Sequence, residues 1–235
     1  MNIKIMSYNT QHCLNYVTRE IDYDIMVDTI KKCSADIIGL QEMRDESERA
    51  DYEAQAKIMA EKLGFYYYFA EAIRFGGLNP YGNALISRFP ILRAETIIIP
   101  DPEVKKYDGY YETRCLLKAE IEVGGGLNVL VSHFGLNPDE HENAVNTVVA
   151  NLADKNCVLM GDFNMEPDNV ILKPIRERMY DTADKFNSEL FSFPSDIPDR
   201  KIDYVFTSSD VKVIDADIPA IVSSDHRPHL ATIEV

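Results

Sequence analysis

Asp162 and Asn164 stand two residues apart in Gly161-Asp162-Phe163-Asn164, directly after the apolar run 157–160. That run is typical of a buried strand. Side chains two residues apart at the end of a strand point the same way, so the carboxylate and the carboxamide can address one bound group. Glycine, aspartate and asparagine also favour turns, and for the tetrapeptide taken alone a simple turn is the better interpretation.

The same arrangement, a polar residue that closes an apolar strand, recurs at three other positions: Asn9, Glu42 and His133. Asp203 differs because it lies inside the largely apolar stretch 201–206, where an unpaired carboxylate is costly. Asp225 and His226 precede the last expected strand. A turn or loop explains each of these residues singly, but it does not explain why all of them lie at strand edges.

The residue types in this set suit metal-assisted chemistry. Carboxylate and carboxamide oxygens are ligands for hard cations such as Mg²⁺ or Mn²⁺ rather than for zinc. The adjacent Asp225 and His226 suggest an imidazole that a carboxylate orients and that acts as a general base. Ser223 and Ser224 precede this pair, but the sequence has no GxSxG motif to support a serine hydrolase.

The elements that must position these residues follow from apolar periodicity. Early in the chain, strands at 2–9 and 36–41 alternate with helices at about 23–33 and 56–63. After residue 65, one more helix at about 144–152 interrupts a series of expected strands: 65–70, 83–87, 91–99, 111–123, 127–133, 157–160, 201–207, 211–217 and 229–235. This count favours a single domain, residues 1–235, with two packed sheets and helices outside.

Long loops are expected at 71–82, 100–110 and 184–200, and the first two are candidate substrate rims. The four cysteines are scattered without a CxxC motif, and we expect Cys33, Cys115 and Cys157 to be buried thiols in a reducing, cytoplasmic location. The remaining histidines match no motif, and we expect them at the surface or in turns: His12, His141 and His229.

The composition restricts the partners. The 235-residue chain has a formal net charge of −15 and no basic patch, so its surface would repel a long polyanion. Divalent cations bound to some of the acidic residues would change the local charge. No apolar stretch is long enough to cross a membrane, and residues 1–8 lack the features of a secretory signal.

Six short motifs occur in order along the chain: Tyr8-Asn9, Leu40-Gln41-Glu42, Ser132-His133-Phe134, Gly161-Asp162-Phe163-Asn164, Lys201-Ile202-Asp203-Tyr204 and Ser224-Asp225-His226. Together they resemble the endonuclease/exonuclease/phosphatase superfamily, which includes pancreatic deoxyribonuclease, abasic-site endonucleases, bacterial sphingomyelinases and inositol-phosphate 5-phosphatases. The motifs extend over essentially the whole chain. The resemblance implies a four-layered α/β/β/α sandwich that hydrolyses phosphate esters.

The resemblance also implies metal and water positions. Glu42 would hold the principal Mg²⁺ or Mn²⁺, and Asn9 would be a nearby ligand or phosphate contact. Asp225 would contribute to a metal position. Asp162 would orient or deprotonate the attacking water, and Asn164 would position phosphate and metal.

Other matching residues would act on the phosphate. His226 would contact the scissile phosphate or act as the base, with Asp203 as its partner. His133 would donate to a phosphate oxygen or to the leaving group. Arg114 matches a position near the phosphate, although an exposed strand arginine is an equal alternative. Asn83 lies in a matching stretch without a defined role and is a candidate substrate contact.

We therefore expect a monomeric, Mg²⁺- or Mn²⁺-dependent phosphodiesterase whose substrate is a small organic phosphate or a lipid headgroup. The net charge of −15 disfavours duplex DNA, and so does the short chain, which leaves little room for insertions that grip DNA. The stretch 132–141 also looks more like the sphingomyelinase-like and small bacterial members than like the abasic-site enzymes. A metal-dependent nuclease is the alternative. A phosphate-binding protein without turnover is a third hypothesis, which the competent residue at every motif position disfavours.

Overall fold

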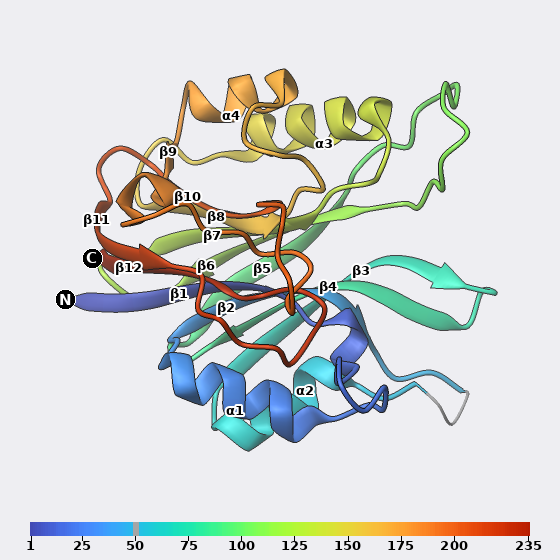
Figure 1. Ribbon diagram of the computed structural model, residues 1–235, viewed down its shortest axis with the longest axis horizontal. Coiled ribbons are helices and arrows are strands. Elements are labelled where there is room, and N and C mark those ends of the chain that lie inside the picture. Colours follow the sequence, from blue (N-terminus) through green and yellow to red (C-terminus); the bar gives the residue numbers. More distant parts are fainter. Residues whose placement is uncertain (49–51) are drawn as a thin grey trace.

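The structure is a computed structural model that describes residues 1–48 and 52–235. Two six-stranded sheets pack face to face, and helices cover the outer faces (Figure 1). The expected four-layered α/β/β/α sandwich is confirmed. Apolar side chains fill the space between the sheets, including Ile5, Val131 and Met160.

The first sheet has the strand order β11-β12-β1-β2-β4-β3. Its strands are β1 (Asn2–Asn9), β2 (Ile37–Arg44), β3 (Tyr66–Phe75), β4 (Asn79–Ser87), β11 (Lys212–Asp217) and β12 (His229–Glu234). Helices α1 (Tyr23–Cys33) and α2 (Gln55–Leu63) cover its outer face. An apolar layer that includes Met26, Ile30 and Met59 packs them against the sheet.

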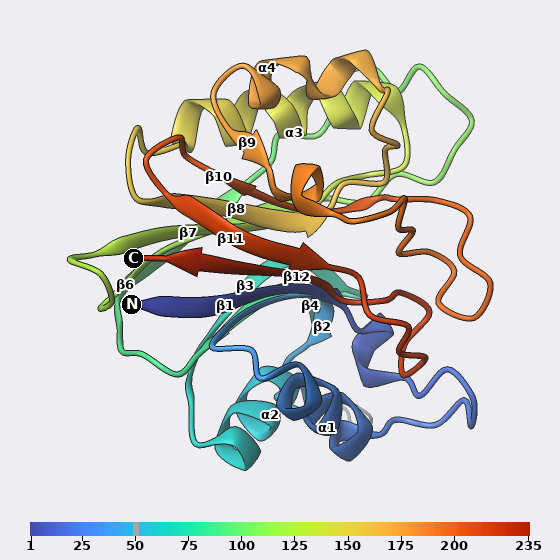
Figure 2. The same ribbon diagram turned by 60° about the vertical axis from the view of Figure 1, so that its left-hand side comes forward.

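The second sheet has the strand order β5-β6-β7-β8-β10-β9. Its strands are β5 (Ile91–Ile98), β6 (Cys115–Ile121), β7 (Leu127–His133), β8 (Cys157–Asp162), β9 (Tyr180–Asp181) and β10 (Asp203–Thr207). Helices α3 (Pro138–Asn151) and α4 (Lys173–Arg176) cover it on the opposite side of the molecule (Figure 2). Phe163 stacks on Phe134 there with ring centroids 4.2 Å apart.

Strand direction brings the predicted residues to one edge of the sandwich. β1 runs parallel to β2, and β7 runs parallel to β8, so in each sheet two neighbouring strands end on the same side. β10 runs antiparallel to β8, and its first residue, Asp203, pairs with Asp162. β12 begins beside the end of β1, where His229 pairs with Ser7, so the preceding segment with His226 lies at the same edge.

Several expected boundaries were wrong. Residues 71–82 are not a loop, because β3 and β4 continue through them as a long hairpin with paired Phe75 and Asn79. Residues 111–114 are not strand, since β6 begins at Cys115. Helix α3 begins at Pro138 rather than near residue 144, because Asn137 and Glu140 form a capping box at its start. The short elements α4 and β9 were not expected.

All four cysteines are buried and free, as expected for three of them. The surface placement expected for His141 and His229 was wrong, because both are buried. The Nε2 atom of His141 lies 2.8 Å from the backbone oxygen of Gly135, and that of His229 lies 3.0 Å from the hydroxyl of Thr182. Within the described residues, no helix is long and apolar enough to cross a membrane.

Candidate active site

Asn9 connects the two sheets at the edge of the sandwich where β1, β2, β7 and β8 end. Its side-chain amide donates to Oε1 of Glu42 over 3.1 Å and to Oδ2 of Asp162 over 3.0 Å. Its own Oδ1 accepts from the backbone N–H of Gln11, so the orientation of the amide is fixed. Asn9 therefore holds together one carboxylate from each sheet.

The backbone is distorted where two of these side chains leave their strands. Glu42 has a φ of 60° beside a register shift between β2 and β4, and Asn164 has a φ of 50°. Residues other than glycine adopt positive φ at a cost of order 1 kcal/mol, and such positions gather at functional sites. Both residues belong to this site, where Glu42 accepts from Asn9 and the amide nitrogen of Asn164 lies 3.2 Å from Nε2 of His133.

Gly161 permits the close approach of β7 and β8 next to Asp162. A Cβ at position 161 would lie 1.9 Å from the backbone oxygen of Ser132, which no side chain tolerates. Asp162 itself is buried, and its Oδ1 accepts from the backbone N–H of Asn164 over 3.0 Å. The glycine and the turn thus fix the Asp162 carboxylate from its own strand.

His226 lies between two buried carboxylates. Its Nδ1 is 2.8 Å from Oδ2 of Asp203, and its Nε2 is 3.6 Å from Oδ2 of Asp162. The ring of Phe193 packs against the imidazole with centroids 4.7 Å apart. A carboxylate oxygen only accepts, so the imidazole donates from Nδ1 to Asp203, which leaves Nε2 directed at Asp162.

This cluster shifts the proton affinity of its members. Burial raises the pKa of Asp162 to about 7, although His226 opposes the shift. Burial lowers the pKa of His226, but the carboxylates of Asp203 and Asp162 outweigh it and raise that pKa to about 10. Without a bound cation the imidazole is therefore held as an imidazolium.

His133 and Arg114 form the opposite side of the site. The Nη1 atom of Arg114 lies 3.0 Å from Nδ1 of His133, and the Nε2 atom of His133 lies 3.6 Å from Oδ2 of Asp162. Burial lowers the pKa of His133 well below its usual value, and the guanidinium of Arg114 lowers it further. His133 is therefore neutral, in contrast to His226. Arg114 is largely buried, so it is not an exposed strand arginine.

Asn164 and Asp225 lie at the margin of the cluster. The side-chain amide of Asn164 donates to the backbone oxygen of Phe134 over 3.1 Å. Asp225 accepts from the hydroxyl of Ser224 over 3.0 Å. Burial raises the pKa of Asp225, and the negative charge of the Glu42 carboxylate raises it further. The two carboxylates therefore repel each other.

The structure does not bring Asn83 into this cluster. Its side-chain amide is buried and donates to the backbone oxygen of Cys115 over 3.0 Å, which ties β4 of one sheet to β6 of the other. This contact gives Asn83 a structural role. Its contact with a substrate remains a prediction.

Comparisons with known proteins identify the family of this chain. The model of the Endonuclease/Exonuclease/phosphatase family matches residues 6–226, which is more than nine-tenths of the chain. The chain belongs to the endonuclease/exonuclease/phosphatase family. Among curated protein sequences, none shows significant similarity to it.

Several solved structures share the fold at low sequence identity. An endonuclease/exonuclease/phosphatase from Beutenbergia cavernae superposes with a TM-score of 0.81 at 18% identity, covering 100% of this chain and 72% of the other. A mannosyl-6-phosphatase from Bacteroides thetaiotaomicron gives 0.77 at 17% identity, covering 99% and 100%. ANGEL2, described as a 2′,3′-cyclic phosphatase, gives 0.70 at 17% identity, covering 99% and 95%.

The side chains of this family member fit a divalent cation. Ligand atoms of Asp162, Asp203 and His226 lie within 4.8 Å of one another. Oδ1 of Asp203 is buried and has no hydrogen-bond partner among the described residues, which is costly unless a proton or a cation neutralises it. The expected carboxylate ligands, Glu42 and Asp225, do not belong to this compact cluster. Glu42 is connected to it through Asn9.

Two contributors were missed in the sequence. Glu112 lies 2.7 Å from Nη1 of Arg114, and Phe193 packs on His226. Glu112 stands two residues before Arg114 in the sequence, a spacing that places both side chains on one side of an extended chain. That spacing was the available signal for Glu112. The position of Phe193, far along the chain in a loop, gave none.

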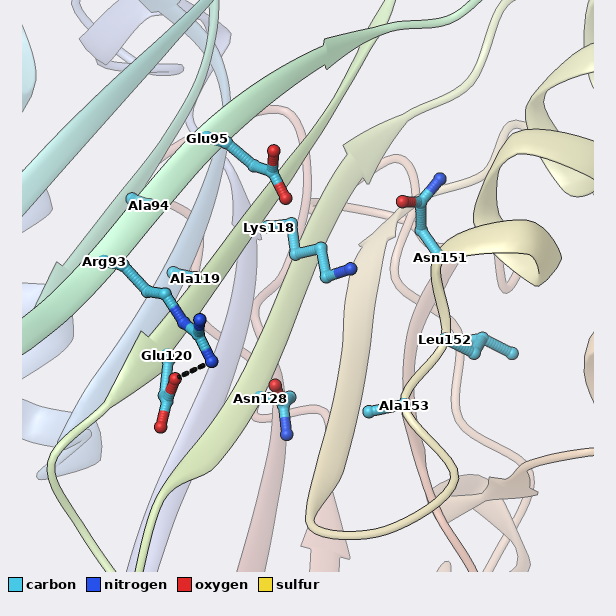
Figure 3. Close-up of a pocket in the computed structure, with 10 residues that line it drawn as sticks. All are labelled: Arg93, Ala94, Glu95, Lys118, Ala119, Glu120, Asn128, Asn151, Leu152 and Ala153. Atoms are coloured by element: carbon cyan, nitrogen blue, oxygen red, sulfur yellow. Dashed lines mark ion pairs between the residues drawn. The ribbon is translucent and has the colours of Figure 1, made fainter.

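A surface groove of about 480 Å³ lies away from this family site, on the outer face of the second sheet. Figure 3 shows Lys118 and Asn151 on opposite sides of it and the ion pair between Arg93 and Glu120. None of the predicted site residues lines the groove. Its charged side chains belong to an exposed sheet face.

Proposed function

We propose that this protein is a divalent-metal-dependent phosphoesterase that hydrolyses phosphodiester bonds of a small organic phosphate or a lipid headgroup. The observation that carries the proposal is the buried cluster of Asp162, Asp203 and His226, which Asn9 links to Glu42 across the sheets. The cytoplasmic location and the monomeric state that we expect from the sequence are part of the proposal.

The chain supplies orientation and proton transfer. Asp203 fixes the Nδ1–H of His226, so that Nε2 faces Oδ2 of Asp162 at 3.6 Å. A water molecule that attacks phosphorus beside these two atoms can lose its proton to Asp162 while His226 is an imidazolium. Nε2 of His226 could accept that proton instead if a bound cation made the ring neutral, and the pair titrates as a unit. Asn9 holds the same Oδ2 and thereby restricts the motion of the Asp162 carboxylate.

Carboxylates next to the cluster would hold Mg²⁺ or Mn²⁺. Glu42 and Asp225 offer oxygen ligands, and Asn9 offers a carboxamide, which is the donor set that hard cations prefer. A bound cation of this kind neutralises phosphate charge and stabilises the leaving group. His133 and Arg114 would donate hydrogen bonds to the phosphate from the other side.

The net charge of −15 favours a compact substrate over duplex DNA. A nuclease remains the alternative activity. The two structural neighbours named above as phosphatases share only the fold, but they indicate which substrates to include: a sugar 6-phosphate and a 2′,3′-cyclic phosphate.

The test is hydrolysis of bis(4-nitrophenyl) phosphate with Mg²⁺ or Mn²⁺, with and without a chelator. We expect metal-dependent turnover that Asp162→Ala abolishes and that the exposed Asp168→Ala variant retains. Undetectable turnover with both metals, or full activity in Asp162→Ala, would contradict the proposal. Plasmid nicking at low salt, run beside a panel of nucleotides, sugar phosphates and phospholipids, identifies the substrate class, and nicking as fast as the generic diester favours the nuclease.

A further inference from the structure

Glu112 occupies a fixed place beside the site although it lies in the segment between β5 and β6. Its backbone N–H donates to Oε1 of Glu140 over 3.3 Å, which attaches it to the first turn of α3. Its side chain is only 9% exposed, and its Oε1 lies 2.7 Å from Nη1 of Arg114. The hydroxyl of Tyr110 lies 3.4 Å from its other carboxylate oxygen.

Nη1 of Arg114 serves two acceptors. It carries two hydrogens, and it lies 2.7 Å from Oε1 of Glu112 and 3.0 Å from Nδ1 of His133. An arginine only donates, so Nδ1 of His133 must accept, and the proton of the neutral ring is on Nε2. Glu112 and His133 together fix the plane of the guanidinium.

This arrangement leaves hydrogen-bond donors free to bind a ligand. Nη2 of Arg114 has no hydrogen-bond partner among the residues that the structure describes. Nε has no partner among them either, but that atom is buried. The proton on Nε2 of His133 faces the amide nitrogen of Asn164 at 3.2 Å, which is no acceptor when its amide donates to Phe134. The carboxylate of Asp162 lies 3.6 Å away, beyond hydrogen-bond distance.

We propose that Glu112 is a positioning residue for phosphate recognition. It holds Nη1 of Arg114 against His133, so that Nη2 of Arg114 and Nε2–H of His133 are presented together to a phosphate oxygen. This inference rests on the proposed phosphoesterase function. It assigns to Glu112 a role that acts through Arg114 and not through contact with the substrate.

The physical reason is the flexibility of arginine. A long side chain loses much of its rotamer entropy when it is ordered, and a neutral imidazole alone is a weak partner for it. A charged carboxylate 2.7 Å away orders Arg114 before the substrate arrives. Donors that are already aligned bind the substrate without a further ordering cost.

The experiment compares Glu112→Ala and Glu112→Gln with Glu103→Gln, which changes an exposed carboxylate of the same loop. We expect kcat/KM for bis(4-nitrophenyl) phosphate to fall about 10- to 100-fold in Glu112→Ala, less in Glu112→Gln, and not at all in the control. The double variant Glu112→Ala with Arg114→Ala should be no worse than Arg114→Ala alone, because both changes remove one unit.

A second readout does not depend on turnover. Nitrogen-15 NMR of the full-length protein, with the His133 signal assigned through His133→Gln, reports which ring nitrogen carries the proton. We expect the Nε2–H form in the unmodified protein and a mixture of forms in Glu112→Ala. A residue that only stabilised the fold would leave this form unchanged in protein that is still folded, and Glu112→Gln replaces Glu112→Ala if the latter does not fold.

The two readouts separate the two proposals. If the unmodified protein hydrolyses the diester but Glu112→Ala keeps both its kcat/KM and its His133 signal, the positioning role is wrong and the function stands. The positioning role is also wrong if the double variant has a lower kcat/KM than Arg114→Ala alone, because the two changes would then act independently. If the unmodified protein shows no hydrolysis, the proposed function fails, and the His133 signal alone decides the positioning role.

Discussion

The Nδ1 atom of His226 lies 2.8 Å from Oδ2 of Asp203, and both side chains are buried. Asp203 is the first residue of β10 and pairs in register with Asp162 of β8. The partner of the imidazole and the carboxylate on its other side are therefore fixed by the same ladder of backbone hydrogen bonds. Such rigid support is what proton transfer at a small site requires.

Asp203→Asn should lower kcat for bis(4-nitrophenyl) phosphate by about 10² to 10⁴-fold with little change in folding. The carboxamide carries no charge, so it would no longer hold His226 as an imidazolium. It can also donate to Nδ1 of the neutral ring, which would leave the ring proton on Nε2 and spoil the orientation of the imidazole. Steady-state kinetics with Mn²⁺ measure the effect. Asp199→Asn, at an exposed carboxylate paired with Arg200, is the control and should keep full activity. Equal activity in the two variants would contradict the assignment.

Glu42→Gln should weaken the response to divalent metal. A ligand at 100 times its Kd stabilises a protein by about 2.7 kcal/mol, so Mg²⁺ or Mn²⁺ should raise the melting temperature of the unmodified protein. The loss of one charged oxygen ligand should reduce that rise, whereas Glu46→Gln, at an exposed position nearby, should not. Thermal unfolding as a function of metal concentration measures both. An identical rise in Glu42→Gln would exclude Glu42 as a ligand.

Gly161→Ala should destabilise the fold by about 3 kcal/mol, because the added Cβ would lie 1.9 Å from the backbone oxygen of Ser132 and must push β7 and β8 apart. Gly64→Ala is the matched control, since its Cβ meets open space and only its φ of 70° is unfavourable, at a cost of about 1 kcal/mol. Urea unfolding gives the two free energies. Equal costs would show that the close approach at Gly161 is not the determining constraint.

Protonation of His229 should weaken the fold in acid. Burial is the main cause that lowers the pKa of this histidine to about 4. Between pH 6.5 and 4 the unfolded chain binds a proton that the folded protein does not, so the free energy of unfolding falls as the pH falls, by up to about 1.4 kcal/mol per pH unit.

His229→Gln removes this contribution to the pH dependence. Urea unfolding at pH 7.5, 6 and 5 should show a smaller loss of stability for the variant than for the unmodified protein. The same pH dependence in both proteins would mean that His229 takes up its proton without opening the fold.

The sequence predicted the strand ends that carry chemistry better than the elements at the edges of the sheets. Asn9, Asp162 and Asp203 were recognisable because they interrupt or close apolar runs that become central strands. Strands were expected at 65–70 and 83–87, but their continuation through 71–82 was missed. β3 is an edge strand with few fully buried residues, so it lacks the alternation that marks a strand with one buried face. The burial of His229 depends on contacts with Thr182, 47 positions away, and has no local signal.

The sequence predicted most of the residues of the candidate site, but not the hydrogen bonds between them. The six motifs identify the family, and they say nothing about which atoms meet. That Asn9 donates to both Glu42 and Asp162 depends on how two sheets pack. Glu112 matches none of the six motifs, and it becomes relevant only because the segment before β6 is attached to α3.

Asn9 bridges the two sheets, so the proposed activity should depend on the distance between them. Glu42 and Asp162 come from different sheets, and the apolar side chains between those sheets set how far apart they stand. A change of even 1 Å in that spacing is enough to cost a large factor in rate. Slight swelling or repacking of the core should therefore abolish the proposed activity while every helix and strand is still intact.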